Sequence, residues 1–258
     1  MRLNNRNLHL GSKEMTINSN IYFDQAEDIE LHANTHLAST WTFSSTCIME
    51  GNGKILYLED GGNIVVECGS RLLMRDMTVF GVSGNNIRGL DSCASFSMQN
   101  VIWILSSNYS FTKGGFELID DFRVRGGNVF AYQSTKTSTI GSNARMIFEE
   151  SSTFSFDPSL DSLFSVTTAK NLIQFTDATS RLVFNTSDLY VTSTGLQLTK
   201  GTLEFRSDCD VRSDASNVWE GIIFGDGASA DNDLNVEVTP NAHLSLYSGH
   251  IWNRNVNT

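Results

Sequence analysis

Short runs in which apolar and polar residues alternate recur along the whole chain. The first five pairs of apolar positions are Leu8/Leu10, Met15/Ile17, Ile21/Phe23, Ile29/Leu31 and Trp41/Phe43. Alternation with a period of two residues is typical of a strand that buries one side and exposes the other. Helical periodicity is nearly absent, and the chain has 2 prolines but many Ser, Thr, Asn and Gly residues. The pattern predicts an all-β protein.

A longer unit also returns along the chain: an apolar-x-apolar strand, a short polar stretch, and a second apolar-x-apolar strand. It reads CGSRLLMRDMTV at 68–79, SCASFSMQNVIW at 92–103 and KGGFELIDDFRV at 113–124. The first apolar residues of the copies, all expected to point inward, are Leu72, Phe96, Phe116, Met146, Leu182, Leu203 and Leu244. Further strands lie between the copies, so each of the shorter intervals holds three strands, as one coil of a parallel β-helix does.

These repeats predict a right-handed parallel β-helix (β-solenoid) with coils of about 20–25 residues. One coil cannot bury its apolar positions alone, whereas stacked coils share one interior and pair their backbones at a spacing of about 4.8 Å. We expect a single domain over 1–258, with 1–25 as a possible N-terminal cap and 253–258 as a polar tail. A β-sandwich is the alternative, but it would favour tight two-residue hairpins, and the connections here are irregular in length.

Composition excludes two classes of function. The chain has 18 Lys and Arg against 29 Asp and Glu, a net charge of −11, and its basic residues are scattered singly. Such a charge repels nucleic acid. No apolar run approaches the ~18 residues of a membrane-spanning helix. The first residues contain no signal peptide, and the repeat is already under way at Leu8, so we expect a start from which a leader is absent.

The four cysteines, Cys47, Cys68, Cys93 and Cys209, show no spacing that indicates a metal site. We expect them to be buried free thiols. The intervals between the first three are close to one coil each. Neighbouring thiols would therefore come within bonding reach if their geometry matched, which leaves a disulfide open.

The polar pairs between the two strands of the repeat are the candidate chemistry. Four of them are Arg75-Asp76, Gln99-Asn100, Asp120-Asp121 and Glu149-Glu150. Stacked in register, they would line one edge of the rod and bind Ca²⁺ or act as the acid pair of a polysaccharide-cleaving enzyme. The catalytic candidates of such an enzyme are Asp76, Asp120, Asp121, Glu149 and Glu150. Polar turns that simply face water are the interpretation we favour.

Histidine and tryptophan add little to the prediction. None of the five histidines neighbours a Ser or Cys motif that indicates a catalytic triad, and we predict neither a metal site nor a cofactor. Trp103 and Trp252 occupy apolar positions of the repeat and are expected in the core. Trp219, in the predicted loop DASNVWEG, is the aromatic candidate for ligand contact.

Residues 47–252 resemble a known group of proteins. MEGNGKILYLEDGGNIVVECGSRLLMRDMTV, SGNNIRGL and EGIIFGDGAS are similar to the repeats of long parallel β-helix proteins abundant in host-dependent bacteria of the Dependentiae type. The wider shape is similar to the pectate-lyase-like superfamily, which includes polysaccharide lyases, phage tailspikes and adhesin passengers. The resemblance implies an extracellular or cell-surface location and adhesion or host contact, with a glycan or a host surface protein as partner.

Repeat motifs specify an architecture far better than an activity. We therefore expect a non-enzymatic structural or interaction module of a surface-displayed or secreted protein. The alternative is a carbohydrate-active β-helix enzyme, either a lyase or a glycoside hydrolase. Full motifs of the polygalacturonases are not found, and Asp120-Asp121 alone is a weak signal. An enzyme would show a groove where carboxylates and basic residues converge.

Overall fold

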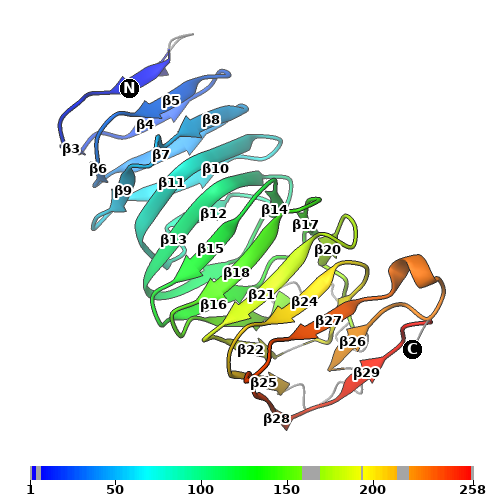
Figure 1. Ribbon diagram of the computed structural model, residues 1–258. Coiled ribbons are helices and arrows are strands. Elements are labelled where there is room, and N and C mark those ends of the chain that lie inside the picture. The colour runs from blue at the N-terminus through cyan, green and yellow to red at the C-terminus, as the bar shows by residue number, and fades with distance from the viewer. Residues whose placement is uncertain (1, 4–6, 159–168, 193, 214–220, 257–258) are drawn as a thin grey trace.

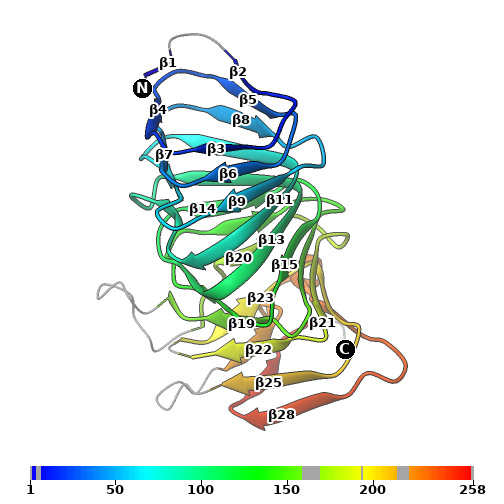
Figure 2. The same ribbon diagram turned by 90° about the vertical axis from the view of Figure 1, so that its left-hand side faces the viewer.

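A computed structural model describes residues 2–3, 7–158, 169–192, 194–213 and 221–256. The chain forms a parallel β-solenoid in which successive turns stack along one axis (Figures 1 and 2). The N-terminus lies at one end of the stack and the C-terminus at the other (Figure 1). All pairings between the named strands are parallel, so the predicted all-β solenoid is confirmed and the sandwich alternative is excluded.

Each complete turn contributes one strand to each of three faces, here called A, B and C. Face A holds β1 (Arg2–Leu3), β4 (Ile21–Phe23), β7 (Thr40–Phe43), β10 (Asn63–Val66), β12 (Ile87–Gly89), β16 (Val129–Tyr132), β19 (Thr153–Phe156), β22 (Asp188–Val191), β25 (Cys209–Ser213) and β28 (Leu244–Ser248). Face B holds β2 (Leu8–Leu10), β5 (Asp28–Leu31), β8 (Cys47–Glu50), β14 (Gly115–Leu118), β17 (Ser138–Ile140), β20 (Ile173–Phe175), β23 (Leu196–Leu198), β26 (Ile222–Phe224) and β29 (Ile251–Asn253).

Face C holds β3 (Met15–Ile17), β6 (Thr35–Leu37), β9 (Ile55–Leu58), β15 (Phe122–Arg125), β18 (Arg145–Glu149), β21 (Arg181–Asn185), β24 (Thr202–Phe205) and β27 (Asn235–Val238). Two long strands, β11 (Arg71–Gly84) and β13 (Ser95–Phe111), bend from face B into face C, and the end of β13 pairs with β16 on face A. The short 3₁₀ helix η2 (Ala230–Asn232) lies between β26 and β27.

The core is a set of columns in which side chains of successive turns lie over one another. On face C, Phe148 is the register partner of Phe184, which is in turn the partner of Phe205. The ring centroids in this column are 5.7 and 5.6 Å apart, and the rings are stacked. Because strands repeat every ~4.8 Å, aromatic rings of adjacent turns meet at a favourable offset. The alternation in the sequence thus becomes a continuous apolar interior.

Six of the seven residues predicted to point inward are buried, from Leu72 to Leu203. The prediction is wrong for Leu244, which is 40% exposed. The seven also do not share one column: Phe116 pairs with Phe96 on face B, whereas Met146 pairs with Phe122 on face C. The two strands of the repeated unit have the same apolar-x-apolar pattern, so the pattern identifies the inward side but not the face.

The last turn is the exception to burial. Trp103 is fully buried, as expected, but Trp252 on β29 is 46% exposed and the expectation that it lies in the core is wrong. Leu246 and Tyr247 on β28 are exposed as well. These strands pair with the turn before them, and no later turn follows among the described residues.

Two of the cysteines form a disulfide. Cys68 and Cys93 are bridged, with their Cα atoms 4.8 Å apart. The expectation of free thiols is therefore wrong for this pair, because the coil length brings their turns together at one corner. It is right for Cys47 and Cys209, which are free and buried.

The segment 1–25, predicted as a cap, contributes strands to the stack. Leu8 and Leu10 of β2 pair with Ile29 and Leu31, and β3 pairs with β6. Its function as a cap stays a prediction. In the described part of the chain, no helix has the length and apolarity needed to cross a membrane.

Candidate functional site

The structure places the five carboxylates predicted from the repeat at two different corners. Asp76, Asp120 and Asp121 lie where the chain passes from face B to face C. Glu149 ends β18 and Glu150 follows it, where face C passes to face A. The expected single acidic edge is therefore wrong. That expectation assumed that the first strand of every copy stacks on the first strand of the copy before it. This fails at Met146, which pairs with Phe122 in the second strand of the preceding copy and not with Phe116 in the first.

Two of the predicted residues act as turn formers. Asp76 has a φ of 47°, and Asn100 in the next turn has a φ of 54°. Asp and Asn adopt this left-handed conformation more readily than most residues with a side chain. The Asn100 Nδ2 donates to Asp76 Oδ1 at 2.7 Å, so the two turns are linked by a hydrogen bond. Backbone geometry accounts for these polar residues without a ligand.

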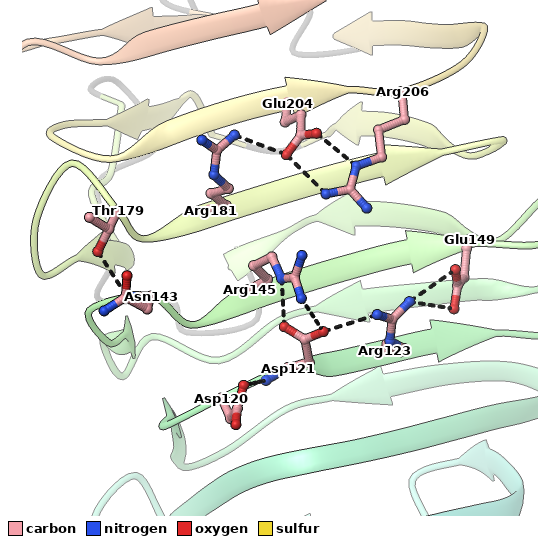
Figure 3. A network of polar contacts seen from close by, with 10 residues as sticks. All are labelled: Asp120, Asp121, Arg123, Asn143, Arg145, Glu149, Thr179, Arg181, Glu204 and Arg206. Atoms are coloured by element: carbon pink, nitrogen blue, oxygen red, sulfur yellow. Dashed lines mark hydrogen bonds and ion pairs between the residues drawn. The ribbon is translucent and has the colours of Figure 1, made fainter. Parts of the chain in front are cut away.

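Asp121 and Glu149 lie in a network of arginines on the outer side of face C (Figure 3). The Asp121 carboxylate accepts from Arg145 at 2.6 and 2.7 Å and from Arg123 at 2.9 Å. Arg123 also lies 3.5 Å from Glu149, which accepts from Arg125 at 2.6 Å. Carboxylates from two corners are thereby joined across the face by guanidinium groups, and neither carboxylate is left without a cation.

A second group of ion pairs is centred on Glu204 of β24. This carboxylate accepts from Arg181 at 3.1 Å and from Arg206 at 2.7 and 3.2 Å (Figure 3). Burial by itself would raise the pKa of the Glu204 carboxyl, but the hydrogen bonds and charges of Arg206 and Arg181 outweigh it and lower the pKa. Glu204 is therefore an ionised acceptor at neutral pH.

One arginine from each group is held as a cation. The hydrogen bond to Glu237, 2.6 Å long, raises the pKa of Arg181 in the second group, and the hydrogen bond to Asp121 raises the pKa of Arg145 in the first. Arg145 and Arg181 are direct register partners, so two like charges neighbour each other. The carboxylates on either side offset that repulsion.

An open hollow of about 480 Å³ lies between β18, β21 and β24. Its lining residues are Asn143, Arg145, Ala178, Thr179, Arg181, Glu204 and Arg206. At one end the Asn143 main-chain N–H donates to Thr179 Oγ1 at 2.8 Å. Guanidinium, amide and hydroxyl groups thus surround a space large enough for part of a small ligand.

The polar lining of the hollow limits the chemistry that it can support. A general acid needs a carboxyl that is protonated near neutral pH, and a general base needs an unprotonated group. Glu204 has a lowered pKa, and the guanidinium groups of Arg145 and Arg181 have raised ones. The arrangement offers donors that bind an anion or a hydroxyl-rich ligand and lacks an obvious proton-transfer pair.

Sequence reasoning missed Arg145, Arg181, Glu204 and Arg206. The available signal was a charged residue next to the apolar core positions of each strand, as in RMIFE, RLVFN and TLEFR. Trp219, the aromatic candidate, lies outside the described residues. Comparison of the chain with protein-family models, with curated proteins and with solved structures finds no match in any of the three.

Proposed function

We propose that the chain is a non-enzymatic interaction module of a surface-displayed or secreted protein, and that the hollow on face C binds a carboxylate-bearing glycan. The observation that carries this proposal is that Asp121, Glu204 and Glu237 around the arginines all accept from guanidinium groups. The hollow therefore presents hydrogen-bond donors held as guanidinium cations. This arrangement favours the binding of an anionic ligand over acid–base cleavage.

The arginines have donors to spare for a ligand. A guanidinium carries five N–H groups in a planar fork that suits a carboxylate. Arg145 binds Asp121 through Nε and Nη2, and Arg206 binds Glu204 through the same two groups. Neither of these ion pairs involves the Nη1 group of the arginine. A carboxylate-bearing sugar seated in the hollow would accept from these groups while its hydroxyls meet Asn143 and Thr179.

The Cys68–Cys93 disulfide supports the proposed location. Disulfides persist in secreted and cell-surface proteins and are rare in reducing cytosol. The resemblance to surface-displayed β-helix proteins points the same way. An extracellular or cell-surface rod that contacts a host glycan is consistent with both.

A glycan-array measurement tests the binding proposal. Uronate-containing glycans should bind better than neutral ones, and Arg206→Gln should weaken that binding at least tenfold. Arg212→Gln is the matched control, because Arg212 pairs with Asp210 on face A, outside the hollow. A second variant, Asn143→Ala with Thr179→Ala, leaves the arginine ion pairs in place and should also weaken binding. Equal binding by all variants would contradict the assignment of the hollow.

A carbohydrate-active enzyme is the alternative, and a parallel assay separates the two functions. Uronate lyases release unsaturated products that absorb in the ultraviolet, and hydrolases release reducing ends. We expect neither product. Turnover that Asp121→Asn abolishes, with folding intact, would overturn the non-enzymatic proposal.

A further inference from the structure

Two histidines and a glutamate converge on face B at the first turns of the solenoid. His9 Nδ1 lies 3.1 Å from Glu30 Oε2, and His32 Nε2 lies 3.2 Å from the same oxygen. The three ligand atoms all lie within 4.8 Å of one another. The imidazole rings are stacked, with centroids 5.8 Å apart.

The two separations from Glu30 suit a zinc ion. Zinc binds histidine nitrogen at about 2.0–2.1 Å and carboxylate oxygen at about 2.0–2.2 Å, so tetrahedral ligands lie about 3.3–3.5 Å apart. The two distances to Glu30, 3.1 and 3.2 Å, are within a few tenths of an ångström of that ligand-to-ligand separation. The His9 and His32 side chains are about half exposed, which leaves room for water to complete the coordination.

The backbone register brings the three residues together. His9 and Glu30 are direct partners between β2 and β5, 21 residues apart in the sequence. The main-chain N–H of His32 donates to the Leu10 carbonyl at 3.0 Å, which fixes its place one turn along from His9. In the sequence, the sign of this cluster is that His9 and Glu30 are about one coil apart, and not a short histidine motif. The pair His32 and His36 does not converge, because His36 lies on face C with Glu14 and Glu59.

The charges next to the cluster favour a cation there. Glu30 is the register partner of Glu50, so two carboxylates stack on the outer side of adjacent turns. Arg75 lies 3.4 Å from Glu50 and offsets the charge on that side. On the other side of Glu30 lies His9, His32 follows Glu30 in its own turn, and a divalent cation among the three would offset the charge of Glu30.

We propose that His9, Glu30 and His32 form a zinc site that joins the first two turns of the solenoid. The ion would link β2 to β5 across the end of the rod. Such a site stabilises the N-terminal end by mass action, since the folded chain binds zinc and the unfolded chain has no preformed site. This site is separate from the hollow on face C and does not depend on the proposed function.

Calorimetric titration of the full chain with Zn²⁺ at pH 7.5 tests the site. We expect one ion per chain with micromolar affinity, and Co²⁺ should give visible absorption bands of low-symmetry coordination. His9→Ala and His32→Ala should each weaken binding at least tenfold. His36→Ala is the matched control, because it removes an imidazole that pairs with two carboxylates elsewhere. Thermal melts without metal establish that each variant is folded.

The competing explanation is a pair of simple hydrogen bonds from the imidazoles to Glu30. In that case Zn²⁺ at 100 µM would produce no heat of binding and no rise in melting temperature beyond that produced by Mg²⁺. Either this result, or zinc binding that is unchanged in His9→Ala and His32→Ala, would overturn the proposal. Zinc binding that weakens below about pH 6.5, as protons compete for imidazole, would support it.

Discussion

The inner turns of the solenoid and its last turn have the same alternating sequence pattern, but their apolar side chains are buried in the inner turns and exposed in the last. Leu203 and Leu244 begin equivalent copies of the repeated unit, yet Leu203 is 1% exposed and Leu244 is 40% exposed. Leu203 has a paired turn on both sides, whereas among the described strands β28 pairs with β25 alone. In a solenoid, burial is supplied by the neighbouring turns and not by the coil itself.

The polar surface shows the same contrast. Glu204 in the inner part of face C has two arginine partners and a side chain that is 12% exposed. Asp208, which pairs with His243 near the last turn, is 77% exposed. A stacked face therefore shields its ion pairs, while the same chemistry at the end stays in water.

Replacing a central aromatic residue should have the largest effect. Phe116 packs 4.1 Å from Phe111 and 5.6 Å from Phe122 between ring centroids, so Phe116→Ala should cost about 3–5 kcal/mol of unfolding free energy. Trp252→Ala at the exposed end should cost less than about 1 kcal/mol. Denaturant melts measure both. Equal losses would mean that the last turn is packed as tightly as the middle, and the comparison would fail.

Removing the disulfide should come next. It closes a loop between residues 25 apart in the sequence, so Cys68→Ala with Cys93→Ala should cost about 3 kcal/mol. The reductant-treated native chain should lose a similar amount. Burial raises the pKa of the Cys209 thiol to about 12 and also raises that of Cys47, so neither thiol should react with a thiol reagent in the folded protein. Detection of four reactive thiols in the native chain would contradict the bridge.

A shielded carboxylate should matter more than an exposed one. Glu204→Gln should cost about 1.5–3 kcal/mol at pH 7, since it weakens charged hydrogen bonds to Arg181 and Arg206. The folded-state pKa of Glu204 is lowered, so this stability is present above the unfolded value near 4.5 and is lost as the pH falls through the folded value. In melts at a series of pH values, the Glu204→Gln variant should lack the loss of stability that protonation of Glu204 causes at low pH. Asp208→Asn, at the end, should leave the melting curve unchanged.

The smallest effect concerns a buried carboxyl. Glu27 is 2% exposed, and neither of its carboxylate oxygens has a hydrogen-bond partner among the residues that the structure describes. Burial, and then the charge of Asp24, raise its pKa. A raised carboxyl pKa means that the contribution of Glu27 itself to stability is most favourable below its unfolded pKa near 4.5 and declines as the pH rises through its folded pKa. Glu27→Gln should flatten this slope in melts from pH 4 to 7. A slope that is unchanged would show that Glu27 is solvated.

The candidate sites were harder to predict than the fold. Asp121 was a candidate from its place in a polar pair, but its partners Arg123 and Arg145 come from neighbouring strands of different turns. The proposed zinc ligands His9 and His32 carry no local motif. Only the number of residues in the intervening coil decides whether they meet, and that number varies from turn to turn.

What the sequence by itself determined is the class of structure and the inward side of each strand. Alternation at period two and repetition at about one coil leave stacked parallel turns as the arrangement that buries the apolar positions. The tertiary structure alone decided which strand lies on which face, as the pairing of Met146 with Phe122 shows. It also decided which cysteines meet and which apolar residues remain in water. The physical reason is that register and burial depend on contacts between turns, and no single turn contains that information.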